Sequence, residues 1–435
     1  MNSMKKLFFE SLGCPKNRVD SEVMIAALMN SGWVITEDPG EADLIILNTC
    51  SFIADARDES VSRFFELHAS LKKGARIGVA GCLPQLYPDL KNVLNEADLV
   101  IGIDNIADIS SIVEKGSSLK IKPSEFIYNS GMERVLTYSP YTCYVKIADG
   151  CENFCSYCSI PFIRGKYRER SVSDIVSEVE NLVANGVKEI VLISQDTTKF
   201  GFVNGSTLSM LLKEINSVVG DFRIRVMYLY PGKVDRSLLE TMKKLRKVVN
   251  YLEIPVQHIS DSVLKGMNRS YNGEDVLELI KEIKNIFGEN YVLRTTFISS
   301  FPSEKKDDHE LLKNFIEEGH FDYSGAFRYS KEEFTKAGKM RSVPKKEADK
   351  RFAEIERAVH IAMEKRLDRF IGLEMDVLYE GIDPELNVPV GRCWHQAPEI
   401  DGITILTNVE NEKCGKYYKC RLVSREGVDF IGEIL

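Results

Sequence analysis

The sequence lacks several features that would place the protein in a membrane or on nucleic acid. It contains no run of ~18 apolar residues, so we expect no transmembrane helix and no membrane partner. Positive charge is not in excess, because 65 acidic residues against 57 basic ones leave a formal net charge of -8. A general affinity for nucleic acid is therefore not expected. The first residues hold only a short apolar run and no small-residue cleavage site, so we expect a β-strand there and not a signal peptide.

Internal repeats and low-complexity segments are also absent, and the 435 residues are enough for two to four ordinary domains. What the chain does have is ten cysteines without an export signal. This combination predicts a cytoplasmic protein in a reducing compartment. There, clustered cysteines more often bind metal or do chemistry than form disulfides.

The apolar pattern divides the chain into three α/β or β domains. Residues 4–120 alternate continuous apolar strands with helices, including one expected over 87–97, which predicts a doubly wound parallel sheet. A polar, weakly periodic linker covers 121–136. About six β/α units over 137–367 predict a partial parallel barrel with its site at the C-terminal ends of the strands. Short strands and turns over 368–435 predict a small all-β barrel.

The stretch "CENFCSYC" directly follows the first expected strand of the barrel. Its cysteines Cys151, Cys155 and Cys158 have the spacing C-x3-C-x2-C, which is one ligand short of a structural zinc site or a ferredoxin cluster. A zinc knuckle with a fourth ligand elsewhere, or buried apolar cysteines, are the alternatives. We favour a 4Fe-4S cluster whose fourth iron is open to a small molecule, and the spacing suggests S-adenosylmethionine as that molecule.

A second triad is dispersed over the N-terminal domain. Cys14, Cys50 and Cys82 each lie at the C-terminal end of an expected parallel strand. Because these ends share one edge of an open α/β sheet, the three thiols can converge despite gaps of more than 30 residues. Three unrelated buried cysteines are the alternative. We expect a second 4Fe-4S cluster with one open iron.

With both triads assigned, the chain resembles the radical S-adenosylmethionine methylthiotransferases over nearly its whole length. The segments that carry the resemblance are "SLGCPKNRVDSE", "LNTCSFI", "AGCLPQLY", "DGCENFCSYCSIPFIRG", "SQDTTKFG", "YLEIPVQHISDSVL", "RTTFI" and "GRCWHQAPEIDG". The order of this family is an N-terminal methylthiotransferase domain, a radical core and a TRAM domain. "GCPKN", "QDTT" and "APEIDG" resemble the RimO branch, which modifies the ribosomal protein S-twelve; the tRNA-modifying MiaB branch is the alternative.

The resemblance implies a transferase that replaces a β C–H of an aspartate in that ribosomal protein by S–CH3. One S-adenosylmethionine would supply the methyl group, and a second, at the cluster of the barrel, the radical that abstracts hydrogen; the N-terminal cluster would handle the sulfur. An electron donor such as flavodoxin is implied, whereas the sulfur donor stays open. We further expect five side chains at strand ends or in the cluster loop to line the cofactor site: Tyr157, Gln195, Asp196, Gln257 and Arg294.

Two further expectations bear on the pocket and the substrate. The chain departs from the usual family pattern at Ser303 and Phe334, where glycine is common, which puts the shape of the cofactor pocket in doubt. From 369 to 435, twelve acidic residues outnumber seven basic ones, which favours a basic protein over RNA as substrate. We expect Glu399 and Asp401 to lie in an exposed turn that attracts this substrate. A non-enzymatic iron–sulfur sensor is a third possibility, but it leaves the barrel unexplained.

Overall fold

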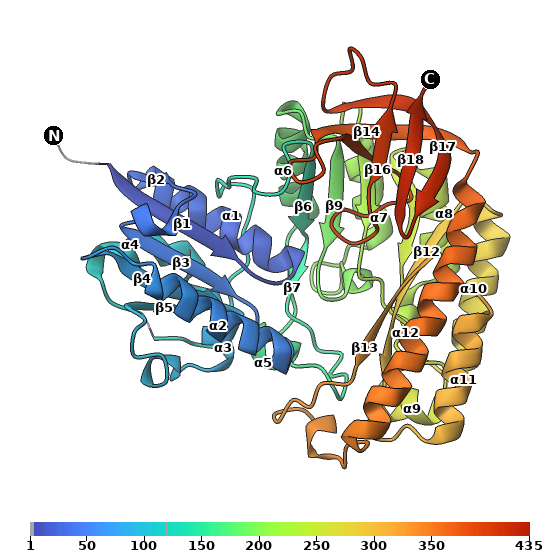
Figure 1. Ribbon diagram of the computed structural model, residues 1–435, viewed down its shortest axis with the longest axis horizontal. Coiled ribbons are helices and arrows are strands. Elements are labelled where there is room, and N and C mark those ends of the chain that lie inside the picture. The colour runs from blue at the N-terminus through green and yellow to red at the C-terminus, as the bar shows by residue number, and fades with distance from the viewer. Residues whose placement is uncertain (1–3, 119) are drawn as a thin grey trace.

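The N-terminal domain, drawn in blue in Figure 1, is a five-stranded parallel sheet of order β2-β1-β3-β4-β5. The computed structural model describes residues 4–118 and 120–435. The strands of this sheet are β1 (Lys5–Ser11), β2 (Trp33–Ile35), β3 (Leu44–Thr49), β4 (Arg76–Gly81) and β5 (Leu99–Ile101). Strand β3 is buried along its whole length, as expected for the centre of a parallel sheet.

Helices cover both faces of this sheet, which confirms the doubly wound fold. They are α1 (Pro15–Asn30), α2 (Ala54–Ala69), α3 (Cys82–Leu86) and α4 (Ile109–Lys115). Helices α1 and α4 share one apolar core with the sheet, whereas α2 and α3 contribute to a separate core on the other side. Helix α1 begins at Pro15, which has no N–H to leave unsatisfied in a first turn.

The helix expected over 87–97 does not form. The chain instead makes the short helix α3 and then a single 3-10 turn, η2 (Leu90–Asn92). Pro88 explains the interruption, because a proline disfavours the helical conformation of the residue before it. Tyr87 accordingly has φ -122° and ψ 82°, outside the helical region.

The second domain is the barrel that was expected, open on one side. Its six strands are all parallel and follow the order β13-β12-β11-β10-β9-β6. They are β6 (Thr142–Lys146), β9 (Glu189–Ile193), β10 (Arg223–Val226), β11 (Val248–Glu253), β12 (Val292–Ser299) and β13 (Tyr323–Arg328). A two-stranded antiparallel ribbon, β7 (Ala148–Asp149) and β8 (Arg168–Glu169), brackets the cysteine loop.

Helices lie on the outer side of this barrel, and side chains from both layers form the largest apolar core of the molecule (Figure 1). They are α6 (Val172–Ala184), α7 (Leu208–Ser217), α8 (Arg236–Lys244), α9 (Asp261–Gly266), α10 (Gly273–Phe287), α11 (Lys306–Glu317) and α12 (Lys345–Leu367). The short helix α5 (Ile160–Ile163) instead lies against α3 of the N-terminal domain (Figure 1). Ser171 caps α6 by accepting a hydrogen bond from the Asp174 N–H, as its sequence predicts.

The C-terminal domain is a closed five-stranded barrel of order β14-β15-β16-β18-β17, drawn in red above the large barrel in Figure 1. Its strands are β14 (Glu374–Ile382), β15 (Pro389–Cys393), β16 (Thr404–Thr407), β17 (Lys416–Glu426) and β18 (Asp429–Ile434). Closure leaves no sheet edge exposed. The remaining 3-10 turns are η1 (Pro39–Glu41), η3 (Ile103–Asp108), η4 (Thr197–Lys199), η5 (Pro231–Lys233), η6 (Ala337–Lys339) and η7 (Asp368–Phe370).

Candidate functional site

The N-terminal triad lies at the C-terminal ends of three adjacent strands. Cys14 precedes α1 after β1, Cys50 directly follows β3, and Cys82 directly follows β4 as the first residue of α3. Gly13 allows this convergence: it has φ +93°, and a Cβ atom there would lie 3.1 Å from the Cys50 sulfur. A larger residue would therefore collide with Cys50, and the backbone conformation itself favours glycine.

The second triad lies in one loop, between β7 and α5. Gly150, with φ +80°, lets this loop begin, because a Cβ there would meet the Lys166 carbonyl oxygen at 2.1 Å. The loop is pinned to the barrel from two sides. The Ser156 N–H donates to the Met267 carbonyl (2.9 Å), and the Ser156 carbonyl accepts from the Ala337 N–H (2.8 Å).

Each triad receives a hydrogen bond from one arginine, which is buried in the case of Arg164 and half-buried in the case of Arg269. Arg164 Nη2 lies 3.4 Å from Cys82 Sγ, and Arg269 Nη1 lies 3.2 Å from Cys155 Sγ. Burial raises the pKa of the Cys82 thiol to about 12, although the Arg164 charge opposes this. Burial likewise raises the pKa of Cys151 to about 11. Buried thiols become ligands only when a metal and nearby cations compensate the thiolate charge, and the arginines meet part of that need.

The sulfur atoms of each triad lie too far apart to bind one metal ion together. Thiolates that share one zinc at ~2.3 Å lie less than about 4 Å apart. Within 4–118 and 120–435, ligand atoms of three such residues come within 4.8 Å of one another only at His309, Glu310 and Glu354. The zinc-knuckle alternative is therefore disfavoured, and three separated thiols with an arginine donor fit an iron–sulfur cluster.

A buried ion-pair network joins the two triads across the domain interface. Arg164 Nη1 contacts Asp20 (2.6 Å) on α1 and Asp149 (3.1 Å), two residues before Cys151. Lys146 Nζ contacts the same two carboxylates, with 3.0 Å to Asp149. All four side chains are at most 2 % exposed. The interface between the domains therefore contains a closed set of two cations and two anions.

Three domain families match consecutive parts of the chain. They are the uncharacterized protein family UPF0004 (residues 6–102), the radical SAM superfamily (145–316) and the TRAM domain (371–435). A ribosomal protein uS12 methylthiotransferase RimO from Thermoanaerobacter sp. (strain X514) is 39% identical, over 99% of this chain and 100% of the relative. The RimO protein of Geobacter sulfurreducens (strain ATCC 51573 / DSM 12127 / PCA) is 38% identical, over 100% and 99%.

The chain belongs to the RimO family of radical S-adenosylmethionine methylthiotransferases. Membership confirms the resemblance, the enzyme class and the three-domain order, and it implies one 4Fe-4S cluster and S-adenosylmethionine. Among solved structures, the radical S-adenosylmethionine methyltransferase TsrM from Kitasatospora setae shares the fold, with a TM-score of 0.57 and 14% identity over 77% of each chain. OxsB, a cobalamin-dependent S-adenosylmethionine radical enzyme, has a TM-score of 0.51 at 14% identity over 81% of this chain and 56% of its own.

Three of the five side chains expected at the cofactor lie around the RimO cluster loop. Gln195 follows β9 and donates to Asp149 (2.8 Å). Asp196 is buried and accepts from Asn153, inside the loop, at 2.7 Å. Tyr157 packs on the small apolar cluster that includes Met267. Their contact with the cofactor stays a prediction.

The other two take different places. Gln257 follows β11 with φ +67° and bridges to β12, so its backbone is constrained at the barrel rim. Arg294 was expected to end a strand, and this is wrong, because it is the third residue of β12. Its guanidinium contacts Asp401 (3.0 Å) and Glu253 (3.4 Å), so it holds the C-terminal domain to the barrel.

The expectation of an exposed acidic turn in the C-terminal domain is wrong for Asp401, whereas Glu399 is exposed as expected. Asp401 is fully buried, and besides Arg294 it accepts hydrogen bonds from the Tyr251 hydroxyl and the Ala397 N–H. Glu399 is paired with Arg18 of α1 at 2.5 Å. The turn therefore contacts both other domains: Glu399 pairs with the N-terminal domain, and Asp401 pairs with the barrel.

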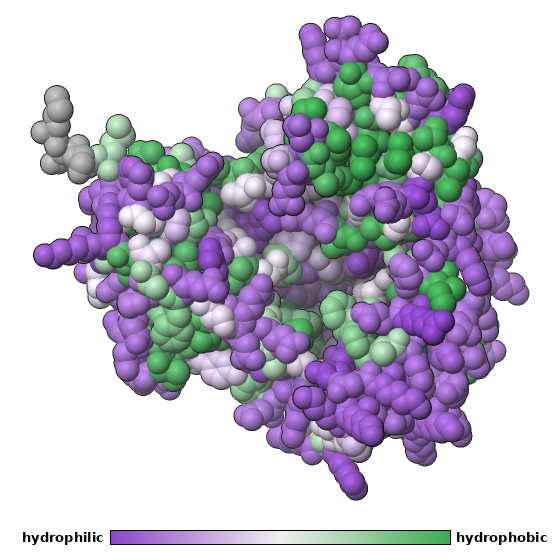
Figure 2. All heavy atoms as spheres, viewed as in Figure 1, coloured by the Kyte–Doolittle hydropathy of each residue, from purple (hydrophilic) through white to green (hydrophobic). Residues whose placement is uncertain are grey.

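A hollow lies between the N-terminal domain, the large barrel and the C-terminal domain, visible at the centre of Figure 2. Lys16 is one of the interface residues that the sequence analysis did not single out. Lys16, two residues after Cys14, is 7 % exposed and places its ammonium 3.2 Å from the centre of the Tyr228 ring. Burial lowers the pKa of Lys16, whereas Cys14 and Glu253 oppose that shift. The letters "GCPKN" pointed to Lys16 only as part of a family motif.

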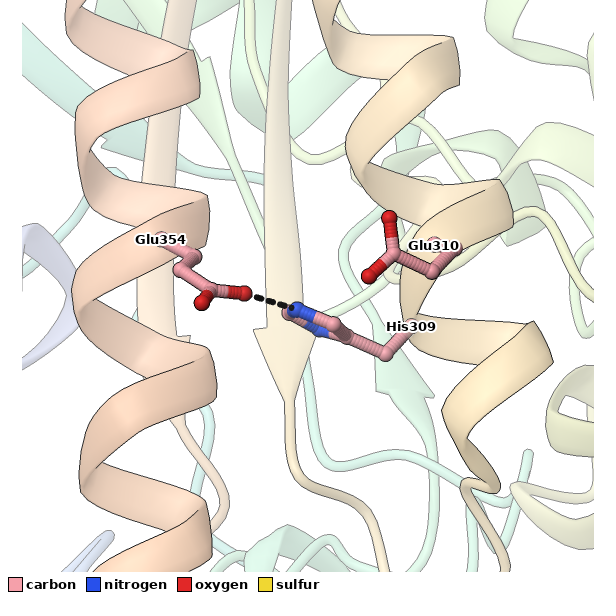
Figure 3. A group of neighbouring side chains, drawn as sticks. All are labelled: His309, Glu310 and Glu354. Atoms are coloured by element: carbon pink, nitrogen blue, oxygen red, sulfur yellow. Dashed lines mark hydrogen bonds and ion pairs between the residues drawn. The ribbon is translucent and has the colours of Figure 1, made fainter.

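In the described part of the chain, the one group of three side chains close enough to share a metal ion lies elsewhere, between α11 and α12 (Figure 3). There, His309 Nε2 lies 2.8 Å from Glu354, whereas Glu310 is exposed and makes no bond to either residue in the picture. This is the geometry of an ion pair between two packed helices, and we assign it to helix packing. Among the described helices, none is both long and apolar enough to cross a bilayer.

Proposed function

We propose that this chain replaces a β C–H of an aspartate in ribosomal protein uS12 by a methylthio group. The observation that carries the proposal is that Arg164, which donates to Cys82 of one cysteine triad, also pairs with Asp149, two residues before Cys151 of the other triad. Relatives 38% and 39% identical over nearly the full length are named for this activity, which supports the same conclusion.

The two triads would have different roles. Cys151, Cys155 and Cys158 would hold a 4Fe-4S cluster, which together with S-adenosylmethionine supplies hydrogen-abstracting radical chemistry once an external donor such as flavodoxin reduces it. The other triad would hold a second cluster, where the sulfur is delivered. A second S-adenosylmethionine would supply the methyl group.

The chain's own residues would position these parts and keep water away from them. Arg269 and Arg164 donate to thiolates, and Asp149 fixes both Arg164 and Gln195. Because Arg164 and Asp149 are buried, their charges act in a medium of low effective dielectric, which strengthens the contact between them.

The acidic balance of the C-terminal domain favours a basic ribosomal protein over tRNA as the substrate. The decisive experiment is mass spectrometry of ribosomal proteins and tRNA from cells with and without this gene. We expect a methylthio increment on uS12 that requires the gene. An unchanged uS12 together with gene-dependent methylthiolated adenosine in tRNA would move this chain to the MiaB type of activity.

A further inference from the structure

Lys16 carries a buried positive charge that nothing in the described part of the chain neutralises by direct contact. No hydrogen bond or ion pair to its ammonium is present there, and its closest partner is the face of the Tyr228 ring. A cation–π contact contributes about 0.5–2 kcal/mol. Taking an ammonium fully out of water costs several kcal/mol, and Lys16, at 7 % exposure, has lost most but not all of its hydration, so an additional anionic partner would be favourable.

The neighbouring carboxylates, Glu253 and Asp149, do not fill this role. Glu253 accepts from the Tyr228 N–H (3.0 Å) and faces Arg294 (3.4 Å), while Asp149 is committed to the interdomain ion-pair network. The carboxylates of this region are therefore engaged elsewhere.

The start of helix α1 favours an anion at the same place. Lys16 is the second residue of this 16-residue helix, whose first turn contains no acidic residue and whose N-cap, Cys14, makes no side-chain capping bond. The partial positive charge of a helix N-terminus attracts carboxylates. Two independent features, a buried ammonium without an ionic partner and an uncapped helix start, thus coincide next to Cys14.

The ligand must reach this position from the interface of two domains. Tyr228 follows β10 at the C-terminal end of the barrel strands, so its contact with Lys16 spans the boundary between the N-terminal domain and the barrel. The same boundary borders the hollow in Figure 2. An incoming side chain would meet the ammonium beside the sulfur of Cys14.

We propose that Lys16, with the start of α1, binds the side-chain carboxylate of the target aspartate. This inference rests on the proposed function, because the anion it names is the substrate residue itself. The carboxylate is attached to the β-carbon that reacts, so holding it beside Cys14 orients that carbon toward the N-terminal triad. Lys16 then selects an acidic protein side chain over a neutral one.

The test measures the affinity of the reconstituted enzyme for full-length uS12 with either the native aspartate or an asparagine at the target position. The wild-type enzyme is expected to bind the aspartate form at least tenfold more tightly. Lys16→Met is expected to bind both forms equally and weakly, whereas Lys16→Arg, which keeps the charge, retains part of the preference. Lys72→Met is the matched control, because Lys72 is a half-exposed lysine of the same domain that pairs with Asp43.

Iron content and uncoupled cleavage of S-adenosylmethionine are measured on every variant and are expected to stay at wild-type levels. An undiminished preference for aspartate in Lys16→Met would overturn the inference, as would a wild-type enzyme that does not distinguish the two forms. If Lys16→Met loses iron, the test rests on Lys16→Arg. A Lys16→Arg enzyme with normal iron content that no longer prefers the aspartate form would contradict the carboxylate role. Failure of the proposed function is a separate result, namely a wild-type enzyme that leaves uS12 unmodified.

Discussion

The ion-pair network at the domain interface predicts a large effect of Asp20→Ala. Asp20 is the only contribution of the N-terminal domain to this set of four charges, and its carboxylate contacts both Lys146 and Arg164. Its removal leaves two buried cations with Asp149 as their single carboxylate. Breaking a buried pair from one side costs about 3–5 kcal/mol, because one charge stays desolvated and uncompensated.

This cost falls on the docking of the N-terminal domain, because the other three groups belong to the barrel. At 1.4 kcal/mol per factor of ten, 3–5 kcal/mol corresponds to a roughly 140- to 3,700-fold larger population of the undocked state. Hydrogen exchange of amides along α1 and β6 measures this population. Asp20→Asn, which keeps one hydrogen-bond acceptor of the same shape, is expected to fall between Ala and wild type.

Asp58→Ala is the control, because Asp58 is an exposed aspartate on α2 of the same domain. It is expected to leave the exchange rates unchanged. If Asp20→Ala exchanged at the wild-type rate in α1 and β6, the network would contribute nothing to docking, and the electrostatic argument would be refuted.

Four further predictions follow from the same contacts. Asp401→Ala should make docking of the C-terminal domain on the barrel less favourable by about 3–5 kcal/mol, because Arg294 loses a buried partner. Thermal unfolding measures the loss, and a defect in substrate modification at unchanged stability would contradict this prediction. Phe334→Gly should cost about 1–3 kcal/mol in melting experiments, since the Phe334 ring makes two aromatic contacts, at 5.9 and 6.1 Å, each contributing ~0.5–1.5 kcal/mol. Burial lowers the pKa of His395 well below its usual value, so on acidification the unfolded state is protonated before the folded state. The contribution of His395 to the free energy of unfolding is therefore complete above about pH 6.5 and falls by ~1.4 kcal/mol per pH unit below it. His395→Gln should reduce this slope when unfolding is measured as a function of pH. Anaerobic reconstitution should bind about eight iron per chain, and alanine at Cys14, Cys50 and Cys82 should remove half and spare S-adenosylmethionine cleavage; loss of all iron would refute two independent clusters.

Both triads could be predicted from sequence because their positions follow from local rules. Cys151, Cys155 and Cys158 share one loop, so their spacing alone brings them together. The dispersed triad required only that β1, β3 and β4 be neighbouring parallel strands, which their continuous apolar runs indicated. Parallel strands then place their C-terminal ends at a common edge.

The partners of these cysteines could not be predicted in the same way. Arg164 meets Asp20 across 144 positions of sequence, and neither residue carries a local signal for the other. The turn with Asp401 was misjudged for a related reason. A charged Pro-Glu-Ile-Asp-Gly turn is usually solvated, but here Asp401 is covered because the domain docks on the barrel, while Glu399 stays exposed. Interdomain contacts of this kind depend on how finished domains pack, which strand and helix periodicity do not encode.

The pairing of Arg18 with Glu399 has a consequence for the biosynthesis of the enzyme. The two residues are 381 positions apart, which a ribosome covers in roughly 20–80 s at ~5–20 residues per second. Throughout this interval the nascent N-terminal domain can fold, yet its side facing the hollow has no C-terminal neighbour. Cys14 and its surroundings are therefore more accessible, to metal carriers and to oxidants alike, before the C-terminal domain is complete than after it docks. If the N-terminal triad holds a cluster, as proposed, this interval gives its assembly the widest access.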